Sequence, residues 1–77
     1  MARAIIWTKD VCNFCTAAKT LMNNKGIDFE EKKVGQGYTK EQLLEAVPTA
    51  RTVPQIFLDG NYVGGYTELK ALLDEQR

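Results

Sequence analysis

Residues 4–15, AIIWTKDVCNFC, join a β-prone run to two cysteines that are separated by two residues. Ile5, Ile6 and Trp7 form a nearly uninterrupted apolar segment, which is typical of a central strand covered on both faces. From about Asn13 to Lys25 the sequence follows a helical period. The apolar stripe of this helix consists of Cys15, Ala18, Leu21 and Met22. A C-x-x-C at such a strand-to-helix junction indicates a thioredoxin-like redox motif when a second strand follows.

A weaker strand and a short helix come next. Residues 28–34 predict a strand, and the four consecutive charged residues 30–33 suit a position at the edge of a sheet, where charge discourages pairing with other chains. Residues 39–42, TKEQ, fit a capping box at the start of a helix. Pro48 is expected to end this helix, since proline cannot continue it.

The last third of the chain predicts a hairpin and a final helix. Residues 55–58, QIFL, read as a strand, and Asp59-Gly60 is a strong turn signal that leads into a partner strand over 61–63. Gly64-Gly65 is expected to break that strand. An amphipathic helix is predicted from the spacing of Tyr66, Leu69, Leu72 and Leu73.

The predicted order of elements is therefore β-α-β-α-β-β-α. The first β-α-β unit should be a parallel crossover, and the last two strands should be antiparallel. This order predicts an α/β, thioredoxin-like fold, with a four-stranded mixed sheet and three helices on both faces. We expect a single domain over residues 1–77.

Composition narrows the classes of function. The chain has 77 residues, ten basic and ten acidic side chains, no histidine and two cysteines. A formal charge of zero argues against nucleic acid as a partner, because phosphate contacts need a clustered excess of Lys and Arg. The run Ala4–Trp7 is too short for a signal segment or a membrane span. We expect a monomeric protein with no membrane partner, cytoplasmic by default.

The spacing of Cys12 and Cys15 gives them different chemical roles. At positions i and i+3 of a helix start the two sulfurs are neighbours, so a disulfide can close with little backbone movement. The helix N-terminus should lower the pKa of Cys12, and Lys9 adds a nearby positive charge. Cys15 lies one turn further on the apolar stripe, where a higher pKa is expected. Cys12 is thus the candidate nucleophile and Cys15 the candidate resolving thiol.

Two plainer interpretations of the cysteine pair are weaker. A zinc site needs four ligands, whereas this sequence offers two cysteines and no histidine. A purely structural disulfide across so short a loop would constrain the unfolded chain very little. No metal and no tightly bound cofactor is therefore expected.

With these motifs in place, the sequence resembles the glutaredoxin family over nearly its whole length. The resemblance is carried by residues 7–9 (WTK), 12–15 (CNFC), 50–57 (ARTVPQIF) and 64–66 (GGY) in this order and spacing. It implies a glutathione-dependent thiol–disulfide oxidoreductase that reduces protein disulfides and glutathione mixed disulfides. Glutathione would be the co-substrate. Disulfide-containing or glutathionylated proteins would be the partners, with ribonucleotide reductase one candidate.

The resemblance also implies a glutathione site. In the family a T-V-P segment with a cis-proline faces the nucleophile, which corresponds here to Thr52, Val53 and Pro54. The lysine before the cysteines, Lys9, would contact the glycyl carboxylate. The family's site also includes the start of the last helix and an aromatic residue between the cysteines. The matching residues are Gly65, Tyr66, Thr67 and Phe14, although Phe14 could equally be part of the core.

Two departures from the family pattern bear on the site. Asn13 stands where the family usually has a proline between the cysteines, and this change leaves the redox potential undetermined by the resemblance. Thr67 stands where many relatives carry an aspartate that meets the glutathione ammonium group. The adjacent Glu68 is a candidate substitute.

Two alternative functions follow from the same motifs. A thioredoxin-like electron donor, for instance to ribonucleotide reductase, would be recharged by a flavoprotein reductase instead of glutathione. A carrier of a [2Fe–2S] cluster would hold it between two protomers through Cys12 and glutathione. The T-V-P and Gly-Gly segments argue against the first alternative, and the second cysteine and the small chain argue against the second.

Overall fold

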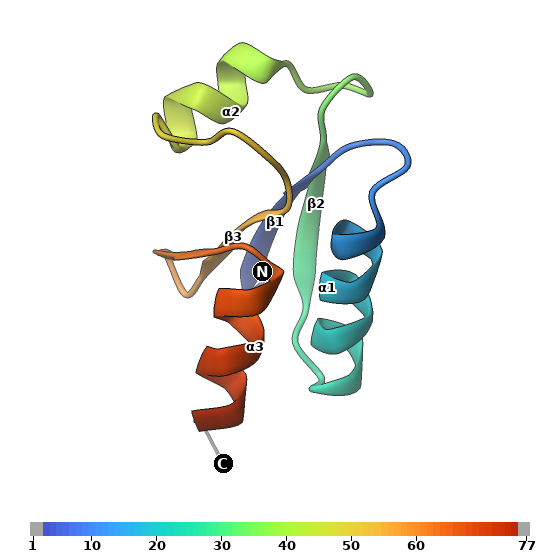
Figure 1. Cartoon of the computed structure of the whole chain (residues 1–77), viewed down its shortest axis with the longest axis vertical. Coiled ribbons are helices and arrows are strands. Elements are labelled where there is room, and N and C mark those ends of the chain that lie inside the picture. Colours follow the sequence, from blue (N-terminus) through green and yellow to red (C-terminus); the bar gives the residue numbers. More distant parts are fainter. Residues whose placement is uncertain (1–2, 76–77) are drawn as a thin grey trace.

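The computed structural model describes residues 3–75, and the elements follow the predicted order (Figure 1). The strands are β1 (Ala4–Thr8), β2 (Phe29–Lys33), β3 (Gln55–Leu58) and β4 (Asn61–Gly64). The helices are α1 (Asn13–Asn24), α2 (Lys40–Ala46) and α3 (Tyr66–Glu75).

The four strands form one mixed sheet in the order β2-β1-β3-β4. Strand β1 pairs in parallel with β2 and antiparallel with β3, and β3 pairs antiparallel with β4. The charged strand β2 therefore lies at one edge, as its composition predicts. The thioredoxin-like topology is confirmed.

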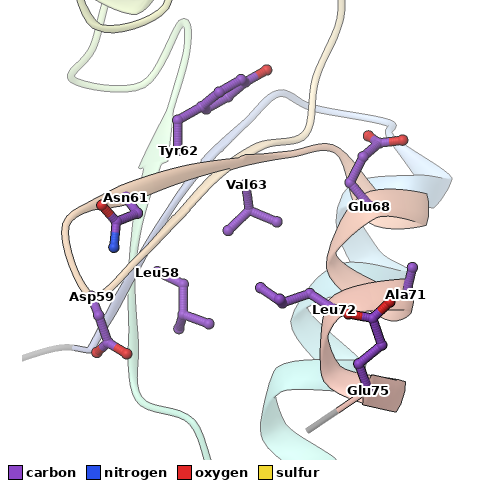
Figure 2. A pocket seen from close by; sticks show the side chains of 9 residues that line it. All are labelled: Leu58, Asp59, Asn61, Tyr62, Val63, Glu68, Ala71, Leu72 and Glu75. Carbon is purple, nitrogen blue, oxygen red and sulfur yellow. The ribbon is translucent and has the colours of Figure 1, made fainter.

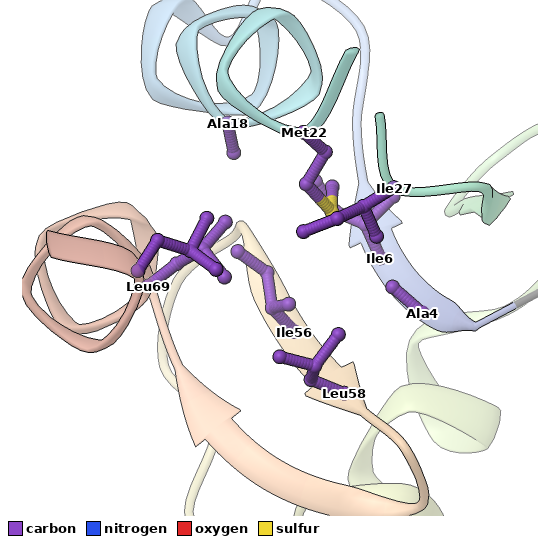
Figure 3. Close-up of a cluster of buried hydrophobic side chains, with 9 residues drawn as sticks. Ala4, Ile6, Ala18, Met22, Ile27, Ile56, Leu58 and Leu69 are labelled. Carbon is purple, nitrogen blue, oxygen red and sulfur yellow. The ribbon is translucent and has the colours of Figure 1, made fainter. Parts of the chain in front are cut away.

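The main core lies between the sheet and the two helices α1 and α3 (Figure 3). Alternate residues of the central strands point into it, because side chains along a strand alternate between the two faces. Both helices add buried side chains from above the sheet. The cluster consists of Ala4, Ile6, Ala18, Met22, Ile27, Ile56, Leu58, Leu69 and Leu73.

The opposite face of the sheet carries the intervening residues of the same strands. Trp7 is buried here and packs edge-to-face against Tyr38, with ring centroids 5.7 Å apart. Ala46 of α2 borders a small cavity on this face together with Ile5 and Phe57. Helix α2 thus lies on the face opposite to α1 and α3, so helices occupy both faces as predicted.

Local signals set the ends of the elements. The capping box at α2 forms as predicted: the Gln42 N–H donates to Thr39 Oγ1 at 3.1 Å, and the Thr39 N–H donates to Gln42 Oε1 at 2.8 Å. Asp59 and Gly60 both have positive φ angles, 53° and 83°, as a two-residue hairpin turn requires. Strand β4 continues through Gly64, one residue beyond the predicted strand 61–63.

Within residues 3–75, none of the helices combines the length and apolar character that crossing a membrane would need. The single-domain extent and the cytoplasmic location stay predictions.

Candidate active site

The loop between β1 and α1 presents Cys12 at the start of a helix. Cys12 is the N-cap residue of α1: its backbone is extended, with φ −133° and ψ 104°. Its carbonyl oxygen accepts the first helical hydrogen bond, from the Thr16 N–H at 3.1 Å. Its sulfur accepts a hydrogen bond from the Cys15 N–H at 3.2 Å. The N-terminal amide of the helix is therefore directed at the Cys12 sulfur.

A disulfide joins Cys12 to Cys15, whose Cα atoms are 5.2 Å apart. Cys15 is on the buried stripe of α1 and only 2% exposed, whereas Cys12 is partly exposed. The two sulfurs therefore differ in access, because an incoming molecule can reach Cys12 but not Cys15.

Cys12 faces the loop that precedes β3. Its Sγ lies 3.8 Å from the carbonyl oxygen of Val53. The Val53–Pro54 peptide bond is cis, as the resemblance implied. The segment Thr52–Pro54 thus lies against the redox-active loop although it is far away in the sequence.

Two side chains that no sequence motif identifies, Gln55 and Tyr62, hold this proline loop in place. The buried amide of Gln55 donates to the Thr52 carbonyl oxygen at 2.7 Å. The Tyr62 hydroxyl on β4 donates to Gln55 Oε1 at 2.5 Å. A buried glutamine bonded on both sides fixes the loop relative to the hairpin, since leaving either group unpaired is costly. The one sequence signal for this role is a polar residue, Gln55, directly after Pro54 at the start of an apolar strand.

A cavity of about 230 Å³, here called the cis-proline cavity, opens beside this loop. It brings together every residue predicted to bind glutathione except Lys9. It is lined by Phe14, Thr52, Val53, Pro54, Gln55, Tyr62, Gly65, Tyr66, Thr67 and Glu68. Three separate parts of the chain, namely α1, the proline loop with the hairpin, and the start of α3, therefore meet in one hollow.

Phe14 is a wall of this cavity and not part of the core. Its side chain is 63% exposed, and its ring lies 6.1 Å from that of Tyr66, measured between centroids. The two aromatic rings form one side of the hollow, which decides between the two interpretations of Phe14 left open by the sequence.

Lys9 lies in a second hollow of about 270 Å³ on the other side of the proline loop. Thr52 and Val53 line both hollows, so they are neighbours. Lys40 and Arg51 join Lys9 here, and no carboxylate of the described residues lines this basic cavity. The sequence motifs did not identify Lys40 or Arg51 as site residues, although Arg51 directly precedes Thr52.

The start of α3 carries its own carboxylate. Glu68 Oε1 accepts a hydrogen bond from the Gly65 N–H at 2.7 Å, which caps the helix. A Cβ atom on Gly65 would come within 3.4 Å of the Pro54 carbonyl oxygen and 3.3 Å of Glu68 Oε1. A residue without a side chain therefore allows the close approach of α3 to the proline loop.

Glu31 ties the base of the redox-active loop to β2 and α1. Its carboxylate accepts hydrogen bonds from the buried Thr8 hydroxyl at 2.6 Å and from Lys19 Nζ at 3.1 Å. The Thr8 hydrogen bond, followed by the interactions with Lys19, lowers the pKa of Glu31 below its ordinary value of 4.5. Through this group, the end of β1 before the redox-active loop and the middle of α1 after it are both joined to β2.

A family model for glutaredoxin matches residues 4–63, which is most of the chain and includes both cysteines and the proline loop. The chain belongs to the glutaredoxin family. It is a glutathione-dependent thiol–disulfide oxidoreductase whose dithiol is Cys12 and Cys15.

Individual glutaredoxins agree with this assignment. Glutaredoxin 3 of Escherichia coli strain K12 is 38% identical over 72 residues, covering 94% of this chain and 87% of that protein. The crystal structure of glutaredoxin 1 from Francisella tularensis, complexed with cacodylate, superposes with a TM-score of 0.82 at 29% identity, covering 99% of this chain and 96% of that one.

A buckwheat glutaredoxin solved in complex with glutathione superposes equally well, with a TM-score of 0.82 at 22% identity. That comparison covers 97% of this chain and 71% of the buckwheat chain, and it supports the shared fold.

Proposed function

We propose that Cys12 is the attacking thiolate and Cys15 the resolving thiol in the reduction of protein disulfides and glutathione mixed disulfides. The observation that carries this assignment is the difference in access: Cys12 is partly exposed beside the proline loop, while Cys15 is 2% exposed. The Cys15 N–H that contacts the Cys12 sulfur would stabilise its thiolate, because an N–H donor favours the charged form.

With a protein disulfide, the Cys12 thiolate attacks one sulfur, the substrate S–S bond breaks, and the second substrate sulfur leaves as a thiolate. Cys15, after losing its proton, then attacks the Cys12 sulfur. This forms the Cys12–Cys15 disulfide and releases the reduced protein. Two glutathione molecules supply the two electrons that return the pair to dithiol, and they leave as glutathione disulfide. A reducing compartment such as the cytoplasm suits this cycle, since glutathione keeps thiols reduced there.

With a glutathionylated protein, Cys12 attacks the glutathione sulfur and the protein leaves as a thiolate. The thiolate of a second glutathione then attacks the glutathione sulfur of the Cys12–glutathione disulfide. That S–S bond breaks, Cys12 leaves as a thiolate, and glutathione disulfide is released. This route does not require Cys15.

The cis-proline cavity and the basic cavity would hold glutathione across the proline loop. The cysteinyl part would lie against Val53, next to Cys12. The glycyl carboxylate would meet Lys9 together with Arg51 and Lys40, the cations of the basic cavity. The buckwheat complex supports glutathione as a ligand of this fold.

The γ-glutamyl end would lie at the start of α3, where Gly65, Tyr66 and Thr67 line the cavity. Helix N-termini favour negative charge, which suits the γ-glutamyl carboxylate. Glu68 lines the same end and offers its carboxylate to the ammonium group. It would thereby compensate for the threonine at position 67.

Two single substitutions test the roles of the cysteines. Cys15→Ser should retain deglutathionylation and lose the reduction of protein disulfides, while Cys12→Ser should lose both. Turnover by Cys12→Ser on either substrate would refute the assignment.

A coupled assay tests the electron source. The wild type is supplied either with glutathione and glutathione reductase or with thioredoxin reductase, and the reduction of a protein disulfide is measured. We expect turnover with glutathione. Turnover with thioredoxin reductase alone would instead support the thioredoxin-like alternative.

A further inference from the structure

A third and larger hollow lies between the β3–β4 hairpin and α3, with a volume of about 600 Å³ (Figure 2). We call it the acidic groove. It is lined by Leu58, Asp59, Asn61, Tyr62, Val63, Glu68, Ala71, Leu72 and Glu75. Its volume is more than twice the 230 Å³ of the cis-proline cavity.

The acidic groove adjoins the cis-proline cavity, which is lined by Val53, the residue that Cys12 Sγ contacts. Tyr62 and Glu68 line both the groove and the cis-proline cavity, so the two hollows are neighbours. A polypeptide whose cysteine reaches Cys12 therefore has a path from the cavity onto this surface.

The groove has an apolar floor and an open side. Leu58 and Val63 of the hairpin point toward Leu72 of α3 across its base (Figure 2). Tyr62 at the shared end is 50% exposed. Strand β4 is the outermost strand of the sheet, so within the described chain its backbone pairs with β3 alone. These features suit a peptide segment, which offers both apolar side chains and backbone hydrogen-bonding groups.

The charges of the groove indicate which segment fits. Asp59, Glu68 and Glu75 line it, and no lysine or arginine of the described residues does. Asp59 is paired with Arg3 at 3.1 Å, and Glu68 accepts from the Gly65 N–H. The exposed Glu75, two helical turns after Glu68, therefore offers the most accessible negative charge.

The basic cavity lies on the other side of the proline loop, with Lys9, Lys40 and Arg51. The surface around the dithiol is thus positive at one end and negative at the other. Such an arrangement orients a bound chain, since like charges placed together are penalised and opposite charges are favoured.

We propose that the acidic groove binds the segment next to the reactive cysteine of a protein substrate, and that it selects segments carrying lysine or arginine. This inference rests on the proposed function, because it requires a protein thiol to reach Cys12. It assigns to the β4–α3 surface a role in choosing among protein substrates that the glutathione site does not supply.

The experiment uses three synthetic peptides, each with one cysteine joined to glutathione as a mixed disulfide. One has three lysines on the N-terminal side of the cysteine, one has them on the C-terminal side, and one has alanines at all these positions. The kcat/KM of deglutathionylation is measured for the wild type, Glu75→Lys and the control Glu45→Lys. Glu45 is an exposed glutamate on α2 that lines neither the groove nor the two cavities, so its replacement makes the same charge change elsewhere.

We expect lysines on one side of the cysteine to raise kcat/KM of the wild type by about two- to five-fold over the alanine peptide, the size that one exposed ion pair gives. Glu75→Lys should abolish this preference, and Glu45→Lys should keep it. High salt should remove it in the wild type, since exposed charges are screened. Equal rates for all three peptides, or a preference that survives Glu75→Lys, would overturn the proposal.

The mixed disulfide of glutathione with 2-mercaptoethanol separates this inference from the proposed function. If the wild type does not turn over this small substrate, the proposed function itself fails. If wild type and Glu75→Lys turn it over equally while the peptides show no preference, only the docking groove is refuted.

Discussion

Cys12 Sγ lies 3.8 Å from the carbonyl oxygen of Val53, although the two residues are 41 positions apart in the sequence. This contact places the more accessible sulfur of the dithiol beside the loop that lines both the cis-proline cavity and the basic cavity. The geometry of the active site therefore depends on how firmly two loops are held: the one that carries Cys12 and the one that carries Val53.

The first loop contains a strained residue. Val11 has a φ of 52° and is 98% exposed. A β-branched residue rarely adopts this conformation, which glycine adopts freely. We expect Val11→Gly to raise the free energy of unfolding by about 1 kcal/mol after the added flexibility of the unfolded chain is deducted.

Thermal unfolding measures this effect. A gain of this size corresponds to a Tm increase of roughly 4–8 °C for a domain of this length. Val11→Ala, which keeps a side chain at positive φ, should gain less than Val11→Gly. A lower Tm for Val11→Gly would show that the exposed valine is stabilising.

The position between the cysteines accepts proline. Asn13 is the first residue of α1, where the missing N–H of proline costs nothing. Cys12 before it is extended, with ψ 104°, which is the conformation that a following proline requires. Asn13→Pro should therefore stabilise the fold by about 0.5–1 kcal/mol through the unfolded state. Chemical denaturation would measure it, and a loss of stability would contradict the described start of α1.

Glu31 makes stability depend on pH. Its pKa is lowered in the folded state, chiefly by the Thr8 hydroxyl and then by Lys19, so its charged form stabilises the fold above the ordinary value of 4.5. This contribution is lost as the pH falls through the lowered pKa. At pH 7 we expect Glu31→Gln to cost about 1.5–2 kcal/mol, the lower end of the range for a hydrogen bond to a charged group, because Glu31 is partly exposed.

Urea denaturation at several pH values tests this. The difference between wild type and Glu31→Gln should shrink as the pH falls below 4.5. Glu30→Gln, on the exposed neighbouring position of β2, is the matched control and should have little effect. A difference between wild type and Glu31→Gln that is the same at all pH values would show that the carboxylate charge is not involved.

The second loop is held by the Tyr62–Gln55–Thr52 chain of hydrogen bonds. Tyr62→Phe removes the hydroxyl that bonds Gln55 Oε1, and we expect a loss of about 1 kcal/mol in stability. Because the proline loop lines the proposed glutathione site, the KM for a glutathione mixed disulfide should rise more than kcat falls. Tyr38→Phe, which changes a ring packed against Trp7 away from this cavity, should leave KM unchanged. An unchanged KM in Tyr62→Phe would mean that the loop does not need this support.

The cations of the basic cavity are expected to contribute to glutathione binding. If the glycyl carboxylate of glutathione lies among Lys9, Lys40 and Arg51, then Lys9→Gln and Arg51→Gln should each raise the KM for a glutathione mixed disulfide by about two- to five-fold. The increase should diminish at high salt. Lys25→Gln, at the far end of α1, is the control. Wild-type KM values in both variants would place the carboxylate elsewhere.

Much of the molecule follows from patterns within a few residues. The helix of the redox motif, the capping box at Thr39, the hairpin turn at Asp59-Gly60 and the edge position of β2 are all predicted correctly from the sequence. Each depends on neighbours along the chain, through helical or alternating periodicity, turn conformation or local charge. The family resemblance adds the cis bond at Pro54, which local patterns alone do not specify.

The active site owes its other features to contacts between distant segments. Phe14 has an aromatic side chain that fits a core as well as a surface, and only packing against Tyr66 places it on the wall of a cavity. Gln55 and Tyr62 show no special pattern, yet they bond across the hairpin. Arg51 and Lys40 lie beside Lys9 because the start of α2 and the loop before β3 pack next to the loop after β1. The dithiol, the order of elements and the fold follow from local preferences along the chain. The side chains that surround the Cys12 sulfur depend on the distances at which separate segments pack, so they emerge only when the chain is folded.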